Sequence, residues 1–93
     1  MKHAGSTALD QLRELLEEIR KHTALKEKKR GIFYMKSSAF LHFHEDPAGL
    51  FADLRAGSGW ERVSITTNRQ KKTLLSRLRA LVKSMELDTS SKR

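Results

Sequence analysis

The sequence predicts an α+β fold, a two-layer sandwich with the element order α-β-β-β-β-α. Leucine-rich segments with helical spacing lie near both ends of the 93-residue chain. Between them, turns rich in Gly and Pro separate segments in which apolar and polar residues alternate. We therefore expect an antiparallel meander sheet of three to five strands, with both helices on one face. The length suits one modest core, so we expect one domain over residues 1–88 and a flexible tail over residues 89–93.

The first helix is expected to begin at Thr7, because Thr7 and Asp10 have the spacing of a capping box. The pattern leaves open where this helix ends. Residues 25–30 either extend it to Lys28 or form an edge strand that lysines protect from further pairing. The apolar stripe of the helix consists of Leu9, Leu12, Leu15, Leu16 and Ile19.

The strands are predicted from two turns. Residues 46–49 and residues 56–59 are each a four-residue turn, so residues 39–65 form two linked hairpins. In this register Leu41 lies opposite Leu54 and Phe43 opposite Ala52, which puts apolar side chains together on the core face. A further strand is expected over residues 32–35, but the sequence does not indicate which of its side chains face the core.

The last helix is predicted to begin with a second capping box, Thr67 to Gln70. We expect it to fray near Leu87. Its apolar stripe, wide enough to cover a sheet, consists of Leu74, Leu75, Leu78, Leu81, Val82 and Met85.

The opposite face of the predicted sheet carries rings and charges, where a solvated face would carry Thr, Lys, Glu and Ser. Aromatic and Arg side chains are typical of the centres of protein interfaces. We therefore predict a non-enzymatic protein that binds a protein partner, or a second copy of itself, through this face. The residues of the predicted face are Phe40, His42, His44, Phe51, Asp53, Arg55, Trp60 and Arg62.

Two other functions remain open at this face. His42, His44 and Asp53 are ligand types that bind iron or zinc, and Arg62 beside them could hold an anion. A single H-x-H spacing is weakly specific, so our main prediction includes no metal and no cofactor. The register places no Ser, Thr or Cys nucleophile beside the row His42–Asp53–Arg62, which disfavours an enzyme without excluding one.

The charge pattern raises the alternative of nucleic-acid binding. The net charge is +8, and residues 67–93 carry eight basic and two acidic side chains. A helix face that could follow phosphates consists of Arg69, Lys72, Arg79 and Lys83. That helix lies on the other side of the sheet from the predicted binding face, so one ligand would hardly use both. Without a long apolar segment, a secretion signal or a Cys, we expect no membrane partner and a cytoplasmic location.

The motif F-L-H-F-H-E-D at Phe40–Asp46, with G-L-F-A-D-L-R at Gly49–Arg55, resembles small bacterial proteins with no assigned activity. In those proteins the same hairpin precedes an aromatic residue, a strand and a Leu-rich helix that opens at Thr. The resemblance covers about residues 9–82. More distantly, the α–sheet–α order is similar to the YjbR-like families, which have a frataxin-like fold and are sometimes labelled DNA-binding. The resemblance implies the sandwich but no site residues. This chain lacks the extended acidic ridge of frataxins, so iron delivery is not implied.

Overall fold

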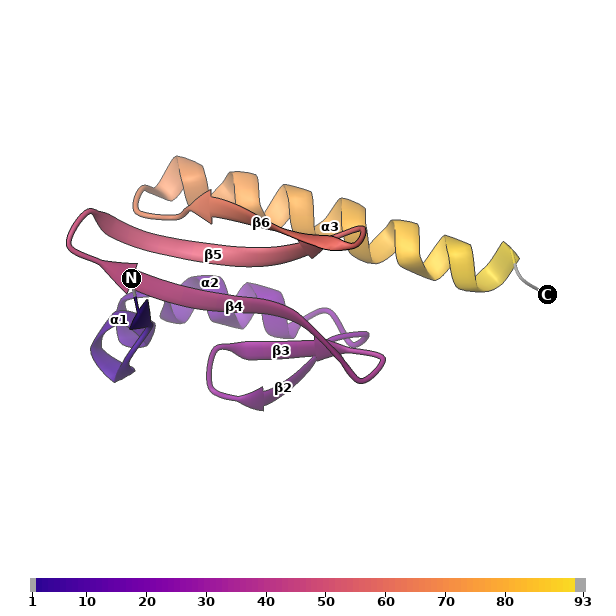
Figure 1. The fold of residues 1–93 in the computed structure, drawn as a ribbon, viewed down its shortest axis with the longest axis horizontal. Helices are drawn as coiled ribbons and strands as arrows, with labels where there is room; N and C mark the ends of the chain where they lie inside the picture. Colours follow the sequence, from indigo (N-terminus) through magenta and orange to yellow (C-terminus); the bar gives the residue numbers. More distant parts are fainter. Residues whose placement is uncertain (1, 92–93) are drawn as a thin grey trace.

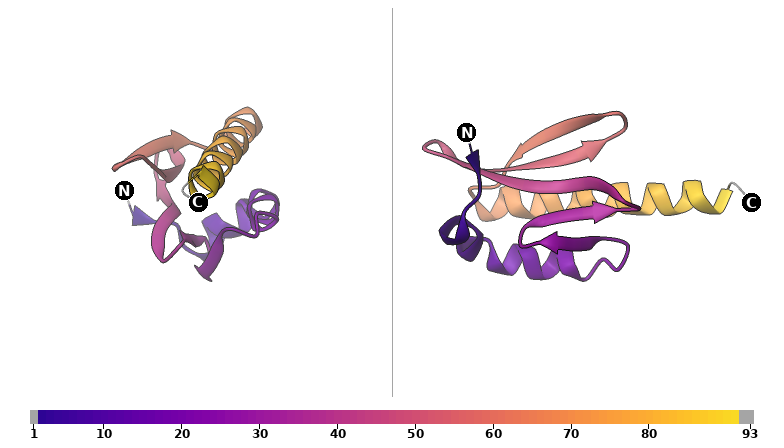
Figure 2. Two further views of the ribbon diagram at one scale, coloured as in Figure 1. Left: turned by 90° about the vertical axis from the view of Figure 1, so that its right-hand side faces the viewer. Right: turned by 60° about the horizontal axis from the view of Figure 1, so that its bottom comes forward.

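The computed structural model describes residues 2–91, and the side chains of residues 2–84. It confirms the α+β class: the helices form one layer, which lies on one face of an antiparallel sheet (Figures 1 and 2). In chain order the elements are β1 (Lys2–His3), α1 (Ser6–Gln11), α2 (Arg13–Arg20), β2 (Lys26–Lys29), β3 (Ile32–Met35), β4 (Ser38–Asp46), β5 (Gly49–Ala56), β6 (Gly59–Ser64) and α3 (Asn68–Ser91).

Strands β2 to β6 form a meander in which each strand pairs with the next. Strand β1 is an addition to the predicted meander. It pairs with β4 through His3 opposite His44 and Lys2 opposite Glu45, beyond the part of β4 that pairs with β3. Two residues are too short for a periodic pattern, so β1 has no signal in the sequence. Within the described residues, no helix is both long and apolar enough to cross a membrane.

The predicted apolar stripes meet between the helices and the sheet. From the helices the core contains Leu9, Leu12, Leu15, Leu16, Ile19, Leu74, Leu78 and Val82. From the sheet it contains Phe33, Met35, Phe40, Leu41, Phe43, Ala52 and Leu54. Leu75 and Leu81 are partly buried against this core, and the side chain of Met85 lies outside the described residues. Each fully buried Leu or Phe contributes about 2 kcal/mol through removal of apolar surface from water.

The predicted hairpin register is confirmed. Leu41 lies opposite Leu54 and His42 opposite Asp53, and the next hairpin places Arg55 opposite Trp60. In the first turn the backbone N–H of Ala48 donates to the Asp46 carboxylate at 3.0 Å. Gly49 has a φ of +143°, and a Cβ there would lie 2.3 Å from Thr66 Oγ1, so the turn requires glycine.

The first helix begins earlier than predicted. Gly5, not Thr7, is the residue before its first turn, and no side chain of the helix itself caps it. The N–H of Gly5 instead donates to Glu45 Oε2 on β4 at 2.6 Å. The pairing of β1 with β4 brings this carboxylate to the helix start, so a tertiary contact replaces the predicted capping box. The helix is also interrupted at Leu12, between α1 and α2.

The second capping box is confirmed. Gln70 N–H donates to Thr67 Oγ1 at 3.1 Å, and Thr67 N–H donates to Gln70 Oε1 at 3.0 Å. Helix α3 continues past Leu87 to Ser91, so its end was predicted too early. The flexible tail over residues 89–93 stays a prediction.

Of the two alternatives for residues 25–30, the structure has the edge strand. The helix ends at Arg20, and residues 26–29 join the sheet as β2. Glu27 of this strand is held from two directions. Arg20 donates to its carboxylate at 2.5 and 2.9 Å, and the Gly31 N–H donates at 2.8 Å. The hydrogen bond from Arg20, and to a smaller extent that from Gly31, lowers the pKa of Glu27 below its usual value.

The substitution Glu27→Gln is expected to destabilise the protein by about 1 kcal/mol at pH 7, since it removes a charge-assisted interaction that is partly exposed. A lowered folded-state pKa means that ionised Glu27 stabilises the fold above the unfolded-state value, near 4.5, and that this contribution is lost as the pH falls through the folded-state value. The difference between the two proteins, measured by urea unfolding, should therefore shrink below about pH 4.5. Glu14→Gln, at an exposed position of α2 without an ion pair to another described residue, is the control for the loss of one carboxylate.

Candidate functional site

The face of the sheet that the helices leave uncovered carries the predicted row His42–Asp53–Arg62, one residue from each of β4, β5 and β6. Asp53 is buried, with only 7% of its surface exposed. Arg62 donates to both carboxylate oxygens, from Nε to Oδ1 at 2.7 Å and from Nη2 to Oδ2 at 2.8 Å. This fork-shaped contact is the main reason why the pKa of Asp53 lies below its usual value. The row therefore contains a carboxylate that is ionised and held rigidly.

Phe40 does not belong to this face, contrary to the prediction. Only 1% of its surface is exposed, and it packs in the core. The pairing of β3 with β4 shifts at this point: Phe33 lies opposite Leu41 but Tyr34 lies opposite Ala39, so Phe40 is an extra residue in β4. Such a bulge interrupts the alternation of side chains, which lets neighbouring residues face the same side.

Trp60 lies on β6 with 43% of its surface exposed, an unusual exposure for a large hydrophobic side chain. The Arg55 guanidinium carbon lies 4.6 Å from the centre of its ring, within the range of a cation–π contact. The ring of His42 lies 4.9 Å away, centroid to centroid. Arg55 is also fixed by its Nε, which donates to the Ala39 carbonyl at 3.0 Å. Together with the partly buried Phe51, these side chains form a preformed aromatic and cationic surface.

A third histidine joins the two that the sequence indicated. Strand β1 places His3 opposite His44, and its ring centre lies 4.8 Å from that of His44 and 5.6 Å from that of His42. The rings of His42 and His44 are 5.0 Å apart. We call His3, His42 and His44 the histidine cluster. Sequence reasoning missed His3 because it lies some forty residues away along the chain and its strand has no pattern of its own.

Polar atoms in the histidine cluster lack partners. Nδ1 of His42 and both ring nitrogens of His44 are buried without a hydrogen bond. His44 Nε2 does lie 3.0 Å from Asp53 Oδ2, within the distance of an ion pair, but the two atoms do not form a hydrogen bond. Burial, with a smaller effect from the neighbouring His44, lowers the pKa of His42, so its ring is neutral near pH 7.

The basic residues proposed for nucleic-acid binding lie on α3, away from this face (Figure 2). Arg69, Lys72, Arg79 and Lys83 are all exposed, as predicted, and none forms an ion pair with another described residue. Arg77 of the same helix differs from them, since it donates to Glu61 of β6 at 2.8 and 3.1 Å and so ties the helix to the sheet.

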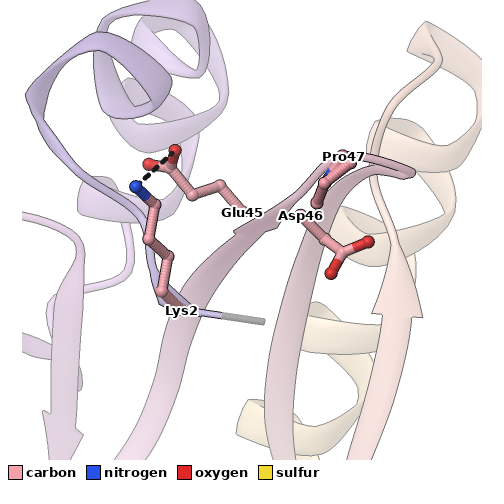
Figure 3. A pocket seen from close by; sticks show the side chains of 4 residues that line it. All are labelled: Lys2, Glu45, Asp46 and Pro47. Atoms are coloured by element: carbon pink, nitrogen blue, oxygen red, sulfur yellow. Dashed lines mark ion pairs between the residues drawn. The ribbon is translucent and has the colours of Figure 1, made fainter.

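A hollow of about 490 Å³ lies near the first turn, away from Trp60, and is lined by Lys2, Glu45, Asp46 and Pro47 (Figure 3). Lys2 Nζ and Glu45 Oε1 are 3.8 Å apart across it. The Asp46 carboxylate points the other way, so the two acids do not converge. Few apolar side chains line this hollow, and we assign it no ligand.

Because Phe40 is buried and Trp60 is partly exposed, replacing each by Ala should lower the stability of the protein by different amounts. Phe40→Ala should destabilise the protein by about 3–5 kcal/mol, because it leaves a cavity in the core. Trp60→Ala should cost about 1 kcal/mol or less, because the ring is partly exposed and does not belong to the buried core. Urea unfolding followed by far-ultraviolet circular dichroism measures both, since that signal does not depend on the removed tryptophan. Equal losses for the two variants would contradict the placement of Phe40 in the core.

Comparison with known proteins yields no match: no protein-family model, no curated protein and no solved structure is similar to this chain. The resemblance to the YjbR-like families therefore stays a prediction, and the function must be argued from the geometry described above.

Proposed function

We propose that this protein is a non-enzymatic binding module whose uncovered sheet face docks an acidic segment of another protein around Trp60. The observation that carries the proposal is the exposure of Trp60, 43% of its surface, on a rigid strand. Trp, Tyr and Arg are enriched among the residues that contribute most of the binding energy in protein interfaces. Trp60 and Arg55 already contact each other, so little side-chain entropy is lost when a partner binds.

The charge of the chain supports an acidic partner. With a net charge of +8, the protein attracts anionic surfaces over distances of about a Debye length. Arg55 has no carboxylate partner among the described residues, whereas Arg62 is already neutralised by Asp53. A carboxylate of the partner would therefore meet Arg55, while an apolar side chain next to it covers the ring of Trp60.

The experiment uses the single tryptophan of the chain, whose fluorescence reports on this face alone. A Glu- and Asp-rich peptide with one central Phe should shift the emission of Trp60 on titration. Arg55→Ala should weaken binding about tenfold, as loss of one partly desolvated ion pair predicts. Trp60→Ala should weaken it at least as much, measured with a labelled peptide by fluorescence polarisation. Arg13→Ala, at an exposed position of α2, is the matched control for net charge and should bind as wild type.

Three outcomes would contradict the proposal. The first is no binding of the peptide at low salt. The second is an equal loss in Arg13→Ala and Arg55→Ala, which would mean that only the net charge attracts the peptide. The third is a change in light scattering with protein concentration that Trp60→Ala abolishes, because it would assign this face to a second copy of the chain.

A second candidate function rests on a different surface. The four exposed cations of α3, which form no ion pair with any side chain that the structure describes, could bind nucleic-acid phosphates without sequence preference. Four phosphate contacts predict a slope of about −3.6 when the logarithm of the binding constant for random duplex DNA is plotted against that of the salt concentration. The double variant Lys72→Ala and Arg79→Ala should reduce the slope by about 1.8. The same change at Lys26 and Lys29 of β2 is the control, and absence of binding at low salt would exclude this function.

A further inference from the structure

We propose that His3, His42 and His44 form a binding site for a divalent transition-metal ion of the zinc class, with Asp53 orienting His44 from behind. Each of the three histidines offers one ring nitrogen, and these nitrogens all lie within 4.8 Å of one another. This site does not depend on the docking of an acidic partner, because it uses other side chains and a different chemistry.

The distances between the three ring nitrogens fit a site whose side chains move together when the ion binds. Zinc holds imidazole nitrogens at about 2.0–2.1 Å in a tetrahedron, which places the nitrogens about 3.4 Å from each other. The nitrogens that lie farthest apart must therefore approach by up to about 1.4 Å. His3 is exposed and lies on a two-residue strand, so it can move, while the other two histidines are fixed on the long strand β4.

The unpartnered nitrogens point to a ligand. Burying an imidazole nitrogen without a hydrogen bond costs about 1–3 kcal/mol. Two such atoms are Nδ1 of His42 and Nδ1 of His44, and the third, Nε2 of His44, lies 3.0 Å from Asp53 Oδ2. If the three rings only packed against one another, nothing would offset the free-energy cost of burying these nitrogens. A metal ion bound by Nδ1 of His42 and Nδ1 of His44 would remove two of these costs.

Asp53 has the position of a supporting residue and not of a ligand. Both of its oxygens are engaged by Arg62, and Oδ2 also lies 3.0 Å from His44 Nε2. A histidine that binds a metal usually donates its other N–H to a carboxylate, which fixes the ring and makes it a better ligand. Nε2 of His44 makes no hydrogen bond here but lies at this distance of 3.0 Å, so a turn of the ring on metal binding would give it this bond to Asp53. The proposed set differs from the set His42, His44 and Asp53 suggested by the sequence, because His3 takes the place of Asp53 as the third ligand. The fourth position would hold water.

Isothermal titration of the metal-free protein with Zn²⁺ at pH 7.5 tests the site. We expect one ion per chain, and at least a tenfold loss of affinity in His3→Ala, which removes a ligand that is exposed and not part of the core. His22→Ala is the matched control, because His22 is the one histidine of the chain outside the cluster. Binding of Co²⁺ adds a spectroscopic readout, since tetrahedral coordination gives strong visible absorption. His42 contacts Trp60, so the ion should also change the tryptophan emission.

The proposal would be overturned by the absence of stoichiometric binding to the wild-type protein. It would equally be overturned if His3→Ala bound Zn²⁺ as tightly as wild type, or if His22→Ala lost as much affinity. Circular dichroism of His3→Ala verifies that the variant is folded, so that a loss of binding is assigned to the missing ligand. If the acidic peptide fails to bind while Zn²⁺ binds with these properties, the metal site stands without the docking function.

Discussion

Strand β4 sets the constraint on which the rest of the molecule depends. It pairs with β5 along one edge, and with β3 and then β1 along the other. Since alternate side chains of a strand point to opposite faces, one register on β4 decides both faces of the sheet at once. Leu41 and Phe43 enter the core below the helices, and His42 and His44 are thereby fixed on the uncovered face. The same register that builds the core therefore assembles the candidate site.

The buried charge of Asp53 is the second constraint. A carboxylate removed from water costs several kcal/mol unless a partner compensates it, and Arg62 supplies two hydrogen bonds in the geometry that guanidinium groups favour. Loss of Arg62 would leave this charge beside the histidines. The ion pair thus holds β5 and β6 together, and it also explains why Asp53 supports His44 without being free to bind an ion itself.

The two proposed uses of the uncovered face meet at His42. Its ring contacts Trp60 of β6, His3 of β1 and His44 of its own strand β4. The exposed indole and Arg55 suit an acidic and apolar segment, whereas the imidazoles suit a transition-metal ion. Both uses depend on strands that α2 and α3 hold from behind, which keeps the face rigid without covering it (Figure 2).

The sequence by itself determined the α+β class, the two hairpins with their register, the capping box of α3 at Thr67 and most of the core stripes. Each of these features depends on residues that are close together along the chain, because turn residues and the spacing of apolar residues are local properties of the sequence. It also placed His42, Asp53, Arg62 and Trp60 on the uncovered face. Only the tertiary structure decided that His3 joins the histidines, that Glu45 caps the first helix through Gly5, and that the bulge turns Phe40 into the core. The reason is physical: these contacts depend on how the strands pair, two of them join residues about forty positions apart, and no local preference encodes them.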